Sequence, residues 1–188
     1  MGTMDAQTAN LLVGLVLVAL IAMAAWFAYQ RKQSHRLERQ FGAEYSRTVD
    51  ELGNRHKAEA ELLQREKRVE KLHIVPLTPE DAARFNQTWK GLQTRFVDDP
   101  KVAVAQADRA VRELMQRRGY PMGDFDRRAA DISVDHPAVV ENYRCAQDIA
   151  QRDLRGEAST EDLRRALVHY RSLFNELLEV DDASRRSS

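Results

Sequence analysis

The side chains best suited to chemistry lie in the stretch ISVDHPAVVENYR, residues 132–144. Within ten positions it holds an aspartate, a histidine, a glutamate, a tyrosine and an arginine, as a catalytic loop can. The residues of interest are His136, Glu141, Tyr143 and Arg144. A pocket that gathered these four side chains would suit a ligand-binding domain or a small enzyme. We take the four as candidate ligand-binding residues and assign none of them a catalytic role.

A rule of helix geometry offers a second interpretation of the same stretch. Three residue pairs place a proline at the opening of an apolar-periodic segment: Thr78-Pro79, Asp99-Pro100 and His136-Pro137. Proline suits the first position of a helix and pushes the residue before it into the N-cap position. We therefore expect His136 to occupy an N-cap and Asp135 to stabilise that helix end through its charge. This interpretation, a helix start, is favoured over a site.

The motifs that mark the better-known catalytic and metal sites are missing from the sequence. A di-iron helical bundle needs two Glu-x-x-His motifs, and the chain has one, from Glu70 to His73. There is no His-Glu-x-x-His zinc motif, no glycine-rich phosphate loop and no Gly-x-Ser-x-Gly elbow. The single cysteine, Cys145, allows no intrachain disulfide, and its place near an apolar helix stripe predicts a small buried side chain. We expect no metal and no cofactor, and favour a role other than catalysis.

Length and charge narrow the classes of function further. The 188 residues allow one domain with a small appendage. The 29 lysines and arginines balance the 29 aspartates and glutamates, so no overall field attracts nucleic acid. We therefore expect no nucleic-acid partner.

The strongest single feature is an apolar run, residues 11–29, that contains no charged side chain. As a helix it would be about 28 Å long, close to the ~30 Å thickness of the hydrocarbon core of a bilayer. Trp26 and Tyr29 stand at its end and Arg31 and Lys32 follow, as is typical of a membrane interface. These residues predict a transmembrane helix over residues 11–30.

A cleaved signal peptide is the alternative, because Ala22-Met23-Ala24 resembles a cleavage site. Residues 1–10, however, hold Asp5 and no lysine or arginine, whereas a signal peptide needs a basic start. An uncleaved anchor is therefore favoured. The positive-inside rule places residues 1–10 outside, as a short extracytoplasmic segment, and everything after Arg31 in the cytoplasm. Ala24 and Ala28 form one weak dimerisation signal, so a homo-oligomer stays open.

Two further regions are expected to be helical. Residues 31–73 are rich in charge and free of proline, which predicts one long juxtamembrane helix, bent or locally broken at Gly42 and Gly53. Residues 74–180 show apolar side chains at steps of three and four and no strand pattern, which predicts a bundle of four long helices and one short helix. The chain is thus predicted to be all-α, with a disordered tail at residues 181–188.

Several stretches of the chain, taken in their order, carry a resemblance to a known family. They are RQFGAEYSRTVDELGNRHKAEAELLQREKRVEKLHIVPL, RFVDDP, RRGYP, SVDHP, ENYR and GEASTEDLRRALVHYRSLFNELL. With these stretches the chain resembles an uncharacterised family of bacterial membrane proteins with one N-terminal transmembrane helix and a helical soluble part. The resemblance implies a bacterial inner or plasma membrane, and it implies no activity, cofactor or partner.

Two classes of function follow from these expectations. The first is a membrane-anchored protein-interaction or scaffold module at the cytoplasmic face, held by residues 11–30 in the bilayer and meeting a protein partner there. It predicts an exposed apolar patch or a self-complementary helix face. The alternative is a ligand-binding domain or small enzyme with a pocket around His136, Glu141, Tyr143 and Arg144. It predicts that these side chains converge in a concave pocket.

Overall fold

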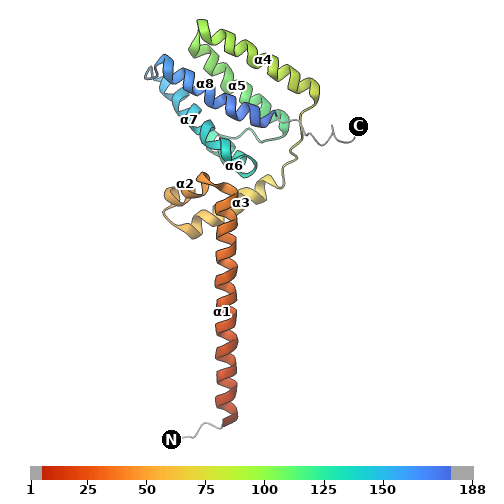
Figure 1. Cartoon of the computed structure of the whole chain (residues 1–188), viewed down its shortest axis with the longest axis vertical. Helices are drawn as coiled ribbons and strands as arrows, with labels where there is room; N and C mark the ends of the chain where they lie inside the picture. The colour runs from red at the N-terminus through yellow and green to blue at the C-terminus, as the bar shows by residue number, and fades with distance from the viewer. Residues whose placement is uncertain (1–5, 179–188) are drawn as a thin grey trace. The chain divides into compact units, whose positions relative to one another are not determined.

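The computed structural model describes residues 6–178, and side chains from residue 14 onward. Every regular element in this part of the chain is an α-helix, which confirms the predicted all-α class (Figure 1). The chain divides into two compact units, residues 1–40 and 41–188, and each is described by itself. The predicted tail at residues 181–188 lies outside the described residues, as do residues 1–5 of the predicted extracytoplasmic segment.

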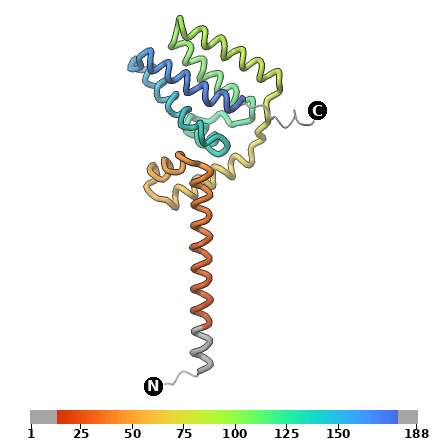
Figure 2. The backbone as a smooth tube through the Cα atoms, viewed as in Figure 1, coloured from red at the N-terminus to blue at the C-terminus, as the bar shows by residue number. Residues whose placement is uncertain are grey.

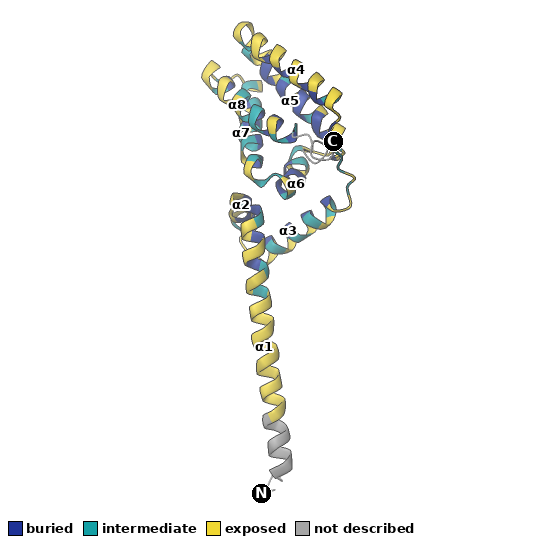
Figure 3. Cartoon of the chain, turned by 45° about the vertical axis from the view of Figure 1, so that its right-hand side comes forward, coloured by how far each residue is buried: buried dark blue, intermediate teal, exposed yellow. Residues whose placement is uncertain are grey.

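The first unit consists of helix α1 (Ala6–Phe41), apart from the last residue of that helix. Its stretch from Gly14 to Phe41 is long and apolar enough to cross a membrane. The large apolar side chains from Leu15 to Tyr29 are each more than half exposed, as the exposed surface of α1 in Figure 3 illustrates. The helix therefore has no partner within this unit that would cover its apolar surface.

Residues 31–73, which the sequence predicted to form one long helix that is bent or locally broken at Gly42 and Gly53, are interrupted at both glycines. The chain leaves α1 at Gly42 and turns again at Gly53, and both glycines have a positive φ that other residues rarely adopt. Between and after them lie α2 (Ala43–Leu52) and α3 (Arg55–Val69), which pack side by side as a helical hairpin (Figure 2). Both glycines thus interrupt the helix, and the turn at Gly53 folds α2 and α3 into the hairpin.

The region after the hairpin forms the predicted bundle of four long helices and one short helix. The long helices are α4 (Pro79–Asp98), α5 (Pro100–Arg118), α7 (Pro137–Leu154) and α8 (Thr160–Leu177), and the short one is α6 (Phe125–Asp135). The helix pairs with the most extensive packing are α7 with α8, α4 with α5, and α5 with α8. Trp89, Tyr143, Tyr170 and Phe174 are among the largest buried side chains of the shared core. The expected period of three and four residues therefore identified the core-facing stripes.

The caps of these helices explain where each one begins. Thr78 and Asp99 accept hydrogen bonds from the backbone N–H groups of Asp81 and Val102, as the proline pairs predicted. His136 also precedes its helix, but its side chain makes no capping bond. Asp135 is the last residue of α6, and its carboxylate accepts a hydrogen bond from the hydroxyl of Tyr120 at 2.9 Å. Asp135 thus ties α6 to the end of α5.

A close backbone contact fixes the segment that connects the hairpin to the bundle. Val75 donates a backbone hydrogen bond to the carbonyl of Arg118 at 2.9 Å. Next to it, Gly119 ends α5 with a φ of 97°, and a Cβ there would collide with the backbone carbonyl of His73. Gly119 therefore supplies both the left-handed turn and the space that this connection needs.

Replacement of Gly119 by alanine should destabilise the fold by about 2 kcal/mol or more, because the new methyl group meets rigid backbone at a positive φ. Gly91→Ala is the matched control, since Gly91 lies inside α4 with open space around its Cα. That variant should gain about 0.5–1 kcal/mol. Urea unfolding of the full chain in detergent, followed by circular dichroism, measures both changes. Equal stabilities of the two variants would contradict the proposed role of Gly119.

Candidate functional site

A polar pocket lies where the hairpin meets the bundle. Its lining comes from α2, α7 and α8: Arg47, Glu141, Arg144, Cys145, Asp148, Ile149, Arg152, Arg165 and His169. The pocket has a volume of about 370 Å³. We call it the arginine pocket, because four arginines contribute to it.

The structure separates the four residues that the sequence brought forward. Glu141 and Arg144 both line the arginine pocket. Tyr143 and His136 are not among its lining residues. Tyr143 is fully buried in the core, where its hydroxyl accepts a hydrogen bond from Nε of Arg128 at 3.2 Å. The four side chains therefore do not share one pocket.

His136 contacts a carboxylate of another helix and makes no capping bond. Its Nδ1 lies 3.2 Å from Oε1 of Glu176 near the end of α8, and its side chain is largely buried. This contact joins the start of α7 to the end of α8. The geometry gives His136 a structural role in the bundle.

A buried carboxylate connects the hairpin to the pocket. Oε1 of Glu44 in α2 accepts a hydrogen bond from Nη2 of Arg144 at 2.8 Å and another from Nη1 of Arg65 in α3 at 2.9 Å. The Glu44 side chain is 1% exposed. A charge removed from water in this way needs close partners, and here two guanidinium groups supply them. Glu44, Arg65 and Arg144 therefore form one ionic joint between three helices, which we call the Glu44 joint.

A second buried ion pair attaches the other arm of the hairpin. Nε and Nη2 of Arg68 in α3 both donate to Oδ1 of Asp131 in α6, at 3.2 and 3.1 Å. Asp131 is 3% exposed. The core cluster of the bundle begins at Leu77 and includes none of the buried apolar side chains of the hairpin, such as Ala58 and Leu62. Within the described residues, buried ion pairs are thus the most prominent link between hairpin and bundle.

Two of the titratable side chains in the pocket wall, Cys145 and His169, have pKa values that are shifted by burial and by nearby charges. Burial raises the pKa of the Cys145 thiol, and the nearby Glu141 carboxylate adds to this effect. Burial also lowers the pKa of His169, and Arg165 lowers it further while Glu141 opposes the shift. Cys145 was predicted to be a small buried side chain, and in the structure it is half-buried in the pocket wall. Neither group is activated as a nucleophile or a cation at neutral pH.

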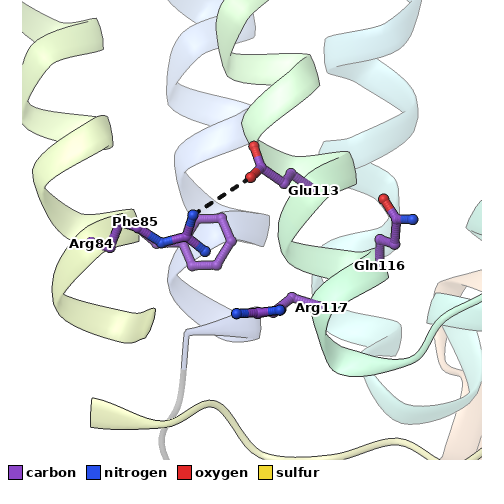
Figure 4. A pocket seen from close by; sticks show the side chains of 5 residues that line it. All are labelled: Arg84, Phe85, Glu113, Gln116 and Arg117. Carbon is purple, nitrogen blue, oxygen red and sulfur yellow. Dashed lines mark ion pairs between the residues drawn. The ribbon is translucent and has the colours of Figure 1, made fainter. Parts of the chain in front are cut away.

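A second pocket, of about 410 Å³, lies on α4 and α5 and is lined by Arg84, Phe85, Glu113, Gln116 and Arg117 (Figure 4). The guanidinium of Arg84 lies 5.0 Å from the ring centre of Phe85 and 3.9 Å from the Glu113 carboxylate. Arg117 binds Asp81 at 3.1 Å, and this hydrogen bond holds the pKa of that carboxyl below its usual value. The charges around this pocket are thus largely matched.

Sequence reasoning missed most of the lining of the arginine pocket. Arg47, Arg152, Arg165 and His169 come from three helices and share no local motif. A usable signal was the polar face of α7, where Glu141, Cys145, Asp148 and Arg152 recur at steps of three and four. Within the described residues, no group of three or more histidine, cysteine or carboxylate side chains could hold a metal ion.

No protein-family model, no curated protein and no solved structure matches this chain. The site therefore has to be interpreted from its own geometry.

Replacement of Glu44 by glutamine should destabilise the fold by about 3 kcal/mol, because it removes the buried countercharge that Arg65 and Arg144 share. Arg65 then keeps only the partly exposed Glu61, and Arg144 keeps only Asp126 at 3.9 Å. Glu161→Gln is the matched control: it removes the same charge from an exposed carboxylate that pairs with Arg164. The control should leave the urea midpoint of the full chain close to its original value. A Glu44 variant as stable as the control would show that the ionic joint does not stabilise the fold.

Proposed function

We propose that the chain is a membrane-anchored helical protein whose bundle acts as a protein-interaction module at the cytoplasmic face of a bacterial inner or plasma membrane. The observation that carries the proposal is the exposed apolar surface of α1. The large apolar side chains from Leu15 to Tyr29 stand more than half exposed over some four turns. A surface of this size is unfavourable in water, whereas a bilayer would cover it.

A bilayer also requires that the backbone polar groups form their hydrogen bonds within the protein, and a helix meets this requirement. Inside hydrocarbon each backbone N–H and C=O needs a partner, and a continuous helix satisfies these groups internally. The stretch from Gly14 to Phe41 has this form. Trp26 and Tyr29, followed by Arg31 and Lys32, mark the end that would meet the interface. These features support a single-pass anchor.

The charge on either side of the anchor supports a cytoplasmic bundle. Residues 1–10 carry Asp5 and no basic side chain, while Arg31, Lys32, Arg36 and Arg39 follow the apolar run. Short basic segments are retained on the cytoplasmic side of the membrane. The bundle would then lie in the cytoplasm.

Exposed apolar residues at one end of the bundle support an interaction role. Val97 at the end of α4 is 82% exposed and Leu154 at the end of α7 is 81% exposed. Nζ of Lys101, at the start of α5 just after α4, lies 3.3 Å from Oδ1 of Asp153 in α7. The turn between α4 and α5 and the end of α7 therefore lie at the same end of the bundle. Interfaces use such apolar groups rimmed by charge. A protein partner would cover Val97 and Leu154.

The orientation can be tested with a reporter fused after Ser188 in a bacterial host. A phosphatase that is active only outside the cytoplasm should stay inactive there, and a fluorescent protein that folds only inside should be bright. Exchanging the flanking charges, with Arg31 and Lys32 changed to glutamate and basic residues placed before residue 10, should reverse both signals at least in part. An active phosphatase on the natural sequence would contradict the proposed orientation.

The interaction surface can be tested by photo-crosslinking in membranes. A photoreactive amino acid at Leu154 and one at Val97, in separate variants, should each yield an adduct with the same protein. Lys90 is the matched control, since it is exposed in α4 but lies away from that end of the bundle. Adducts at Lys90 alone, or equally at all three positions, would contradict a specific surface at Val97 and Leu154.

A further inference from the structure

The arginine pocket carries more positive than negative charge in its wall. Four arginines line it, and Glu141 and Asp148 are the only carboxylates among the lining residues. Each of the four arginines contacts a carboxylate, and only the contact between Arg144 and Glu44 is buried. The contacts of Arg47, Arg152 and Arg165 are partly exposed to solvent, where ion pairs are weak. The pocket therefore has donor capacity that a ligand could use.

Arg152 and Arg165 illustrate this capacity. Both form ion pairs with the same carboxylate oxygen, Oδ1 of Asp162, at 3.7 and 3.5 Å. The other oxygen of Asp162 is already bound, since Oδ2 accepts hydrogen bonds from the N–H and hydroxyl of Ser159 in the cap of α8. Arg152 has one closer partner, Asp148, whose side chain is 70% exposed. The guanidinium groups of Arg152 and Arg165 therefore have more N–H donors than the carboxylates of Asp148 and Asp162 can accept.

Arg144 adds positive charge to the same wall. Its Nη2 is held by Glu44, and its Nε is buried without a hydrogen-bond partner among the described residues. Because Nε has almost no surface open to solvent, Arg144 contributes to the pocket through the charge of its guanidinium group. Arg47 reaches the pocket from α2, where its contact with Glu51 is also exposed. Donors therefore approach the pocket from the hairpin as well as from α7 and α8.

The chemistry that suits these donors is a tetrahedral dianion. Each guanidinium presents a planar fork of N–H groups that matches two oxygens of a phosphate, and several forks can share one phosphate. The pocket volume, about 370 Å³, exceeds what a bare phosphate needs and falls within the range of small-ligand sites. The extra space would take the organic part of an ester.

We propose that the arginine pocket binds the phosphate group of a phosphate monoester. Arg152 and Arg165 hold the phosphate oxygens by exchanging their exposed carboxylate contacts, Arg47 supplies further donors and Arg144 contributes its positive charge. A soluble metabolite and the head group of phosphatidic acid both present this group. This inference goes beyond the interaction role proposed above, and it holds or fails independently of whether a protein partner covers Val97 and Leu154.

The test uses the full chain in phosphatidylcholine nanodiscs and glycerol 3-phosphate as the probe, at constant ionic strength. Isothermal titration calorimetry should show saturable binding. Arg165→Gln and Arg152→Gln should each weaken it about tenfold, because each loses a charged hydrogen bond. Arg164→Gln is the matched control: Arg164 is the neighbour of Arg165 and is equally exposed, at 57% against 58%, but it binds Glu161 outside the pocket. The control should bind like the natural chain.

Nanodiscs that contain phosphatidic acid distinguish the two sources of the phosphate. If the lipid fills the pocket, the natural chain should melt at a higher temperature in nanodiscs that contain phosphatidic acid than in phosphatidylcholine alone. It should also no longer bind glycerol 3-phosphate in those nanodiscs. The Arg165→Gln variant should not show this added stability. If the ligand is soluble, both lipid compositions should give the same titration. Absence of binding in phosphatidylcholine together with no Arg165-dependent stabilisation in phosphatidic acid would overturn the proposal. An equal loss in Arg164→Gln would overturn it as well.

Discussion

The second unit of the molecule depends on one buried carboxylate. Glu44 sits at the point where α2, α3 and α7 meet, with its Oε1 bound by Arg65 and Arg144. Removing three charges from water is costly, so such a joint contributes orientation more surely than net stability. The hairpin cannot slide along α7 without separating Glu44 from Arg144, which would deprive the buried carboxylate of one of its two hydrogen-bond donors. Glu44 therefore fixes where the hairpin sits, and with it where Arg47 lies.

The same interaction gives the pocket its shape. Arg144 belongs both to the Glu44 joint and to the pocket wall, so one guanidinium group stabilises the fold through Nη2 and also places its positive charge at the pocket. An anion that approached Arg144 would share its positive charge with Glu44. Occupancy of the pocket and attachment of the hairpin are therefore coupled through a single side chain, and thermodynamic linkage makes that coupling reciprocal. The ion pair between Arg68 and Asp131 restrains the far arm of the hairpin independently.

Patterns among neighbouring residues predict the helices of the bundle, but they do not predict the Glu44 joint. The stripe through Phe85 and Trp89 and the cap at Thr78 follow from periodicity and from the needs of a helix start, so both could be predicted from neighbouring residues. Gly53 could be recognised as a weak point, but a turn at a positive φ forms only if the helices on either side gain from packing together. Part of that gain comes from Arg65 of α3, which binds Glu44 of α2 across the turn. The remaining partner of Glu44, Arg144, lies a hundred residues away, and no local pattern connects the two.

Helix geometry also explains why a cluster in the sequence became dispersed in space. Successive residues in an α-helix point about 100° apart, so Tyr143 and Arg144 cannot face the same way even though they are adjacent. Tyr143 turns into the core and Arg144 to the joint. Side chains converge instead at steps of three and four, which is why Glu141 shares its pocket with Cys145 and Asp148. In a helical protein, a chemically rich stretch is therefore weaker evidence for a site than polar residues that repeat along one face and meet an arginine from another helix.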